Sequence, residues 1–182
     1  MQSQMEVITS HHDQSVTQIL AQQIKLKSDP DFGGYLDPET GFAQGAAWGS
    51  GIACDMAVSA YCAQGSRYYR DEHVLICARD FLAHVLYSQN TDGTMDQKAS
   101  NFEDATATAF TVIVLGCTFE VLSRYGGTHP VVSEMMGMLL QIMQRSAGAM
   151  VHGGFHTPNH RWVLCCAMSI CHAIVHEECL NE

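Results

Sequence analysis

A polar loop that contains glycine occurs three times in this chain, each time just before an apolar stretch of helical length. The loops are centred on Gly34, Gly93 and Gly154, which lie 59 (93 − 34) and 61 (154 − 93) positions apart. Such a period is typical of one helical hairpin plus a long connection, and so of a repeat built from stacked helix pairs. Equivalent loops of a repeat gather on one face, where their polar residues can share a cleft.

Helical periodicity between these loops predicts three helix pairs. The expected helices cover residues 13–27, 46–64, 71–89, 102–125, 130–150 and 158–176. The second, fourth and sixth are almost uncharged, which is typical of internal helices, whereas the first, third and fifth carry more polar residues and are expected outside. No strong strand pattern or domain linker is present. We therefore predict an all-α fold of three antiparallel hairpins, with residues 1–182 as one helical domain and 1–12 flexible.

Two helix starts have recognisable capping patterns. Ser100 and Glu103 have the spacing of a capping box, in which the serine caps the helix and the glutamate reaches back. Thr157 is placed to cap the last helix, with Pro158 at its first helical position.

Composition limits the classes of function. A net charge of −10 disfavours nonspecific binding to nucleic acid or to an anionic membrane, because both need a positive field. The most apolar stretch, Trp162–Val175, is too short to span a bilayer, and residues 1–10 show no secretory signal. The eight cysteines include no C-x-x-C pair, which favours reduced, buried thiols and a cytoplasmic location.

The third loop is the richest in reactive side chains. Within it lie His156, Asn159, His160, Arg161 and the flanking Phe155 and Trp162. Histidine exchanges protons near neutral pH, arginine binds anions, and aromatic faces stack on sugar rings. The alternative is that these residues only cap a helix, but a cap needs one such residue, so a functional site is favoured.

The other two loops offer weaker candidates. Asp92 and Asp96 are placed to act as an acid/base pair or to bind a cation, although Asp-Gly is also ordinary turn chemistry. Tyr35 and Trp48 are candidates for stacking on a sugar. His172 and His176 are spaced i, i+4 but lack the glutamate of a zinc-protease helix, so neither a metal nor another cofactor is expected.

The segment Gly153–Trp162, together with Asp92–Asp96, resembles the α/α-toroid part of heparinase II/III-like proteins, over most of the chain from about Phe32 onward. The resemblance implies eliminative cleavage of uronate-containing polysaccharides. Carried over, Asn159 would neutralise the uronate carboxylate, His160 or His156 would be the base, and Arg161 would anchor the carboxylate. Substrate binding would fall to Arg161, Trp162, Tyr35, Trp48, Asp92 and Asp96.

This chain also departs from that family, because a closed toroid has more than three hairpins and a β-sandwich usually follows it. The chain is therefore expected to be catalytically incomplete alone, either as the N-terminal half of a longer protein or as a half-ring that pairs with another copy. Two other functions stay open. One is an α/α-barrel glycoside hydrolase with Asp92 or Asp96 as general acid, and the other is a non-catalytic helical repeat that binds a sugar or protein.

Overall fold

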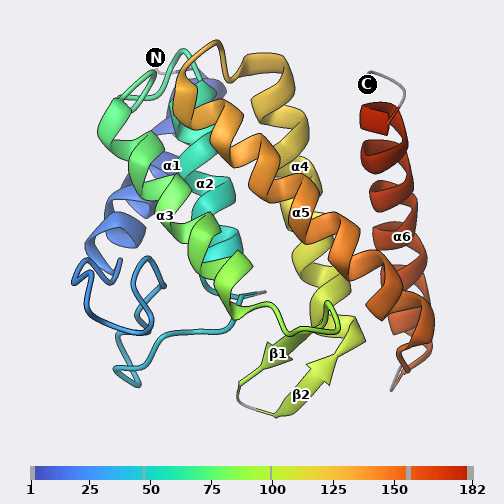
Figure 1. Ribbon diagram of the computed structural model, residues 1–182. Coiled ribbons are helices and arrows are strands. Elements are labelled where there is room, and N and C mark those ends of the chain that lie inside the picture. The colour runs from blue at the N-terminus through green and yellow to red at the C-terminus, as the bar shows by residue number, and fades with distance from the viewer. Residues whose placement is uncertain (1–2, 47, 99, 155–156, 180–182) are drawn as a thin grey trace.

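A computed structural model describes residues 3–46, 48–98, 100–154 and 157–179, with side-chain burial described as far as His176. In order, these residues form α1 (Gln4–Ala21), α2 (Ser50–Cys62), α3 (Glu72–Ser88), β1 (Met95–Gln97), β2 (Asn101–Asp104), α4 (Ala105–Tyr125), α5 (Pro130–His152) and α6 (Pro158–Cys179). The predicted mostly helical fold is confirmed. Five of the six helices start and end within four residues of their predicted limits. The chain ends lie at one end of the molecule and the β1–β2 hairpin at the other (Figure 1).

The helices pack around α4, which contacts α2, α5 and α6. In the same packing α2 contacts α1 and α3, and α3 contacts α5. Helices α2, α4 and α6 therefore form one row, and α3 and α5 lie beside each other against it (Figure 1). Helix α4 has neighbours on several sides, as its nearly uncharged sequence predicted.

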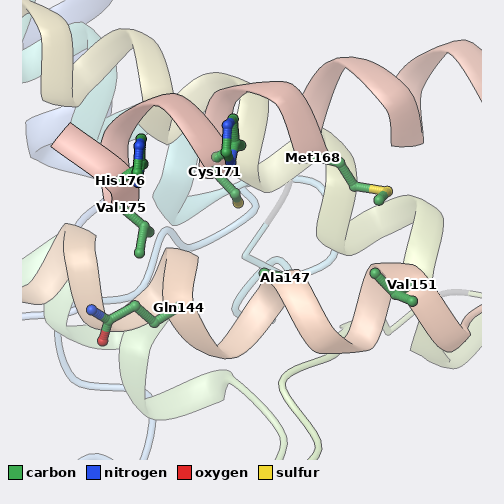
Figure 2. Close-up of a pocket in the computed structure, with 8 residues that line it drawn as sticks. Gln144, Ala147, Val151, Met168, Cys171, Val175 and His176 are labelled. Carbon is green, nitrogen blue, oxygen red and sulfur yellow. The ribbon is translucent and has the colours of Figure 1, made fainter. Parts of the chain in front are cut away.

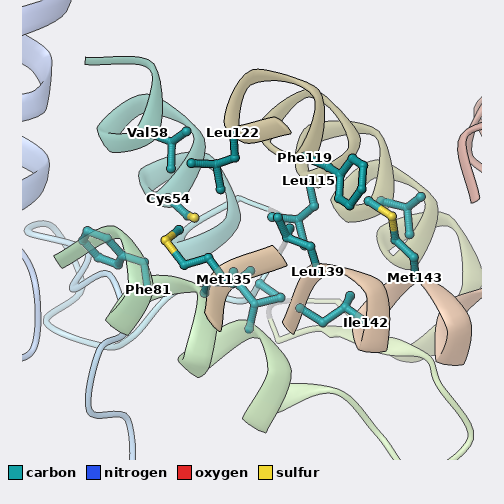
Figure 3. Close-up of a cluster of buried hydrophobic side chains, with 14 of the residues drawn as sticks. Cys54, Val58, Phe81, Leu115, Phe119, Leu122, Met135, Leu139, Ile142 and Met143 are labelled. Carbon is teal, nitrogen blue, oxygen red and sulfur yellow. The ribbon is translucent and has the colours of Figure 1, made fainter. Parts of the chain in front are cut away.

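The core fills the space between α2, α3, α4 and α5, as Figure 3 shows. Its fully buried side chains include Cys54, Phe81, Leu115, Leu139, Ile142 and Met143. Burial of each large apolar side chain stabilises the fold by about 1.5–3 kcal/mol. Helix α4 is long and apolar enough to cross a membrane by length and composition, and 67% of its most apolar window is buried inside this core.

Helix α6 was predicted to be an internal helix, but it is exposed on one side. One face is buried through Leu164, Ala167 and Cys171, which follow one another at helical spacing. The opposite side is open: Trp162 is 79% exposed, and Cys166 and Ser169 are exposed too. The prediction was wrong in this respect, because no described element packs on the second apolar side of α6.

Two helix starts also differ from the sequence analysis. Helix α1 begins at Gln4, nine positions earlier than predicted, where Ser3 and Glu6 form a capping box. The predicted capping box at Ser100 is wrong, because residues 101–104 form a strand that pairs antiparallel with β1. Glu103 has a φ of 50°, a left-handed conformation that cannot start a helix. The cap of α4 is Asp104 instead.

The loop that follows α1 docks on α3 through two backbone carbonyls. Gln23 Nε2 donates a hydrogen bond to the Cys77 carbonyl at 2.8 Å. Gly33 has a φ of 81° and lies so close to α3 that a Cβ atom on it would be 2.3 Å from the Asp80 carbonyl oxygen. A glycine is required here for both reasons.

The loop that follows α3 docks on α5 in the same way. Gln89 Nε2 donates to the Ile142 carbonyl at 3.2 Å. Gly93 has a φ of 88°, and a Cβ atom on it would be 2.1 Å from the Arg145 carbonyl oxygen. In both loops the two carbonyls are three positions apart. The first and second loops therefore make the same kind of contact, each with the helix after next.

Candidate functional site

Residues from the three loops line one cavity of about 520 Å³ beside the β1–β2 hairpin. The first loop supplies Trp48, the second supplies Gln97, Asn101 and Asp104, and the start of α6 supplies His160. We call this the His160 cavity. The expectation that equivalent loops share a cleft is met for these residues.

A second cavity of about 560 Å³ adjoins the first, because both are lined by Trp48 and Gln97. We call it the Lys98 cavity. Its other polar lining includes Asp31, Asp37, Gln44, Asp96 and Lys98. Lys98 Nζ lies 3.3 Å from Asp31 Oδ1, so its positive charge is already paired with a carboxylate.

Trp48 stands between the two cavities with 53% of its surface exposed. Its ring lies 5.4 Å from the ring of Phe110 on α4, centre to centre, at an angle of 44°. This contact fixes one side of the indole and leaves much of its surface to solvent. An exposed aromatic ring held by a second ring is suited to stack against the apolar face of a sugar.

His160 is the described residue that brings the third loop into the cleft. It is half-buried, and its Nδ1 lies 3.4 Å from Thr106 Oγ1 at the start of α4. Asn159, Arg161 and Trp162 are exposed, and none of them is among the residues described as lining the two cavities. Successive helical residues point about 100° apart, so one turn cannot aim all four side chains at one cavity.

Asn159 is instead held locally, since its Oδ1 accepts a hydrogen bond from Thr157 Oγ1. Of the four predicted residues Asn159, His160, Arg161 and Trp162, His160 is the one described as lining a cavity of the cleft. His156, the other predicted base, lies outside the described residues.

The carboxylates of the second loop shape the backbone. Asp104 Oδ1 accepts hydrogen bonds from the N–H groups of Thr106 and Ala107, at 2.7 and 2.9 Å, and so caps α4. Its Oδ2 accepts a bond of 2.6 Å from Asn101 Nδ2. Asp104 therefore takes up backbone donors at the N-terminus of α4 that would otherwise attract an anion.

Asp92 and Asp96 have different surroundings. The side-chain and backbone hydrogen bonds from Thr94 hold the pKa of Asp92 below its usual value. Asp96 Oδ1 accepts bonds of 2.8 Å from Asn90 Nδ2 and from the Glu103 N–H. Asp96 lines the Lys98 cavity, whereas Asp92 lies in the turn that precedes β1.

Tyr35 packs against the core, and its backbone N–H donates to Ser50 Oγ at 3.2 Å. It is not among the residues described as lining either cavity. Ser50 Oγ lies 2.9 Å from His84 Nδ1, and His84 Nε2 lies 3.4 Å from Asp31 Oδ1. This Ser-His-Asp chain has no exposed nucleophile, because Ser50 is fully buried. It supports the first loop.

Burial lowers the pKa of His84, although its hydrogen bond to Asp31 opposes the shift. The imidazole is therefore neutral at pH 7 and links the first loop to α3 without a buried charge. In the part of the chain that the structure describes, no three histidine, cysteine or acidic side chains come together as a possible metal site.

Several cleft residues were missed by the sequence analysis, above all Gln97 and Phe110. Gln97 and Asn101 belong to the β1–β2 hairpin, whose strands are too short and too polar to show an alternating pattern. Phe110 belongs to an apolar helix and looks like a core residue in the sequence.

No protein-family model matches the sequence, and neither a curated protein nor a solved structure matches the chain. A functional conclusion therefore rests on the chemistry of the cleft.

Proposed function

We propose that the two adjoining cavities bind an oligosaccharide, and that the chain supplies the helical part of a polysaccharide lyase acting on uronate-containing glycans. One observation carries the proposal. Three loops at even spacing in the sequence deliver an aromatic ring, amide groups and a histidine to one cleft. The resemblance of the third loop to heparinase II/III-like proteins supports the same function.

The cleft has the groups that a sugar chain needs. Sugar rings have apolar faces that stack on exposed indoles, and Trp48 can serve a ring in either cavity. Hydroxyl groups exchange hydrogen bonds with amides, which Gln97 and Asn101 provide in one cavity and Gln44 in the other. A few polar groups around an aromatic wall are typical of specific small-ligand sites.

Elimination begins with removal of the proton next to the uronate carboxylate. His160 is the described histidine in the cavity, and a neutral imidazole is a suitable base near pH 7. Asn159 and Arg161 flank it on the same helical turn, but they are exposed and outside the described lining of both cavities. In the proposal they contact the substrate carboxylate where the sugar chain extends beyond the cavity, and there they stabilise the developing enolate.

Hydrolysis is less well supported than elimination. A glycoside hydrolase needs one carboxyl group that keeps its proton until the glycosidic bond breaks. Hydrogen bonds from Thr94 lower the pKa of Asp92, so this carboxyl group does not have the surroundings of a general acid. Asp96 Oδ1 already accepts hydrogen bonds from Asn90 Nδ2 and from the Glu103 N–H, so this oxygen is engaged within the hairpin.

Charge favours a second candidate, a cleft that binds a neutral sugar without cleaving it. Asp31, Asp37, Asp96 and Asp104 line the two cavities, whereas Lys98 is the described lysine there and is paired with Asp31. Carboxylates at this density repel a uronate. They also accept hydrogen bonds from neutral sugar hydroxyls.

Incubation with uronate-containing and neutral oligosaccharides distinguishes these functions. New ultraviolet absorbance from an unsaturated uronate supports the lyase. New reducing ends without that absorbance support the hydrolase, and calorimetric binding without either product supports the neutral-sugar module. No binding of any oligosaccharide would overturn the proposal.

Matched variants locate the site. Trp48→Ala should weaken binding at least about tenfold, or ~1.4 kcal/mol, whereas Trp162→Ala should not, because Trp162 lies off both cavities. His160→Ala should lower any lyase turnover by about 10²–10⁴-fold, the usual contribution of a general base. His73→Ala, at the far end of α3, is its control. Equal losses in Trp48→Ala and Trp162→Ala would show that the substrate lies elsewhere.

A further inference from the structure

Two histidines lie one turn apart in the C-terminal half of α6, at the rim of a groove of about 430 Å³ between α5 and α6. His172 and His176 are both exposed, and their rings stack with centres 5.4 Å apart and an angle of 8° between the ring planes. Cys171 and Val175 point from α6 toward α5, whereas the ring of His176 does not (Figure 2). The two imidazoles are therefore neighbours on one side of a helix and open to solvent.

The helix fixes the spacing of this pair. Helix α6 is continuous from Pro158 to Cys179, and residues four positions apart on a helix have Cβ atoms about 5–6 Å apart on the same face. A transition-metal ion binds an imidazole nitrogen at about 2.0–2.1 Å, so one ion can reach a nitrogen of each ring after a small rotation of the side chains. Because the rings already stack side by side, an ion has little side-chain ordering left to impose.

The sequence analysis expected no metal at this pair, because the glutamate of a zinc-protease helix is missing. In such a helix the two histidines bind the ion and the glutamate serves as general base. Its absence therefore removes the base and leaves both ligands in place. Two protein ligands leave the other coordination positions of the ion to water, so the bound ion is exchangeable.

The surroundings of the pair select the class of ion. No carboxylate is among the described residues that line the groove, which disfavours Mg²⁺ and Ca²⁺ because they need oxygen ligands. Burial raises the pKa of Cys171 to about 11, and its Sγ donates a hydrogen bond to the Met143 carbonyl at 3.6 Å, so this thiol stays protonated and is no ligand. Imidazole nitrogen remains, which suits Zn²⁺, Ni²⁺ and Cu²⁺. The net charge of −10 attracts any of these cations to the chain.

We propose that His172 and His176 chelate a divalent transition-metal ion of the group Ni²⁺, Cu²⁺ and Zn²⁺. The unfolded chain does not hold two histidines at this spacing, so the ion binds the folded state in preference and stabilises it by mass action. The proposal does not depend on sugar binding, since the pair lies at the opposite end of α6 from His160.

Calorimetric titration with NiCl₂ near neutral pH tests the site. Ni²⁺ is the probe because, unlike Cu²⁺, it does not oxidise the exposed thiols of this chain. His172→Ala and His176→Ala should each weaken Ni²⁺ binding by roughly 10²–10⁴-fold, because either change turns a chelate into a single ligand. His11→Ala should bind as wild type does, since this exposed histidine of α1 has Val7 and Ser15 four positions away. MgCl₂ should give no binding at the pair.

Two double variants keep the number of histidines and change only their spacing. His176→Ala with Met168→His makes a new pair four positions apart with His172, one turn earlier, and should restore Ni²⁺ binding. His176→Ala with Ala173→His puts the two histidines on adjacent positions, which do not face each other, and should not restore it. All four positions are exposed, so the buried side of α6 is unchanged, and circular dichroism checks the helix. Wild-type affinity in both single variants would overturn the proposal, and so would equal restoration by the two double variants.

Discussion

Gly93→Ala should detach the second loop from α5 and lower the free energy of unfolding by roughly 3–4 kcal/mol. The φ of 88° places this residue in the left-handed region, which costs an alanine about 1–2 kcal/mol. The new Cβ atom would lie 2.1 Å from the Arg145 carbonyl oxygen, and contacts below 3.0 Å essentially do not occur. The loop must therefore retreat by about 0.9 Å (3.0 − 2.1) from a backbone that cannot yield.

That retreat also strains the hydrogen bonds of Gln89. Its Nε2 donates to the carbonyls of Gly93 and Ile142 at 3.0 and 3.2 Å, and both lengthen when the loop moves from the helix. Each lost bond costs about 1 kcal/mol, which gives the total above. Native domains are stable by about 5–15 kcal/mol, so the change is large but measurable.

Urea unfolding followed by circular dichroism measures the effect. Gly137→Ala is the matched control, because Gly137 is exposed within α5 and nothing lies within 4 Å of its Cβ position. That variant should gain about 0.5–1 kcal/mol from better helix propensity. Gly33→Ala should lose as much as Gly93→Ala, since its Cβ would lie 2.3 Å from the Asp80 carbonyl oxygen. A loss below about 1 kcal/mol in Gly93→Ala would refute the docking argument.

Three further substitutions test single groups by equilibrium unfolding. Asp104→Ala should lower the free energy of unfolding by about 1–2 kcal/mol, because α4 loses its cap. Asp104→Asn should retain most of the stability that the cap provides. Burial raises the pKa of Asp55, so its charge is unfavourable in the folded state at neutral pH. Asp55→Asn should therefore be more stable than wild type at pH 7, with the difference fading as the pH falls from the raised pKa of Asp55 toward about 4, the ordinary value in the unfolded chain, and a constant difference would contradict this. Burial lowers the pKa of His84, so wild type should lose stability below pH 6.5 relative to His84→Gln. If the free energy of unfolding of the two proteins changed with pH in the same way, the buried neutral ring of His84 would be contradicted.

The sequence predicted the helices well, because the buried side of a helix places apolar residues at regular intervals along the chain. The uncharged stretches around Val58 and Leu115 predicted α2 and α4, which lie in the core. The β1–β2 hairpin shows no such spacing of apolar residues, since Phe102 and Glu103 are both exposed and the register of the two strands depends on hydrogen bonds. The cap of α4 was misplaced for the same reason. Asp104 and Glu103 are both plausible near a helix start, and only the backbone conformation decides between them.

The candidate site was predicted as three loops that share a cleft, and that much follows from the repeat. Which individual side chains line the cleft could not be predicted from the sequence. Asn159, His160 and Arg161 are adjacent in sequence, yet helical rotation turns only His160 toward the cavity among them. Tyr35 was chosen as an aromatic loop residue, but it packs on the core. Phe110 was passed over because an aromatic residue in an apolar helix resembles any other core residue.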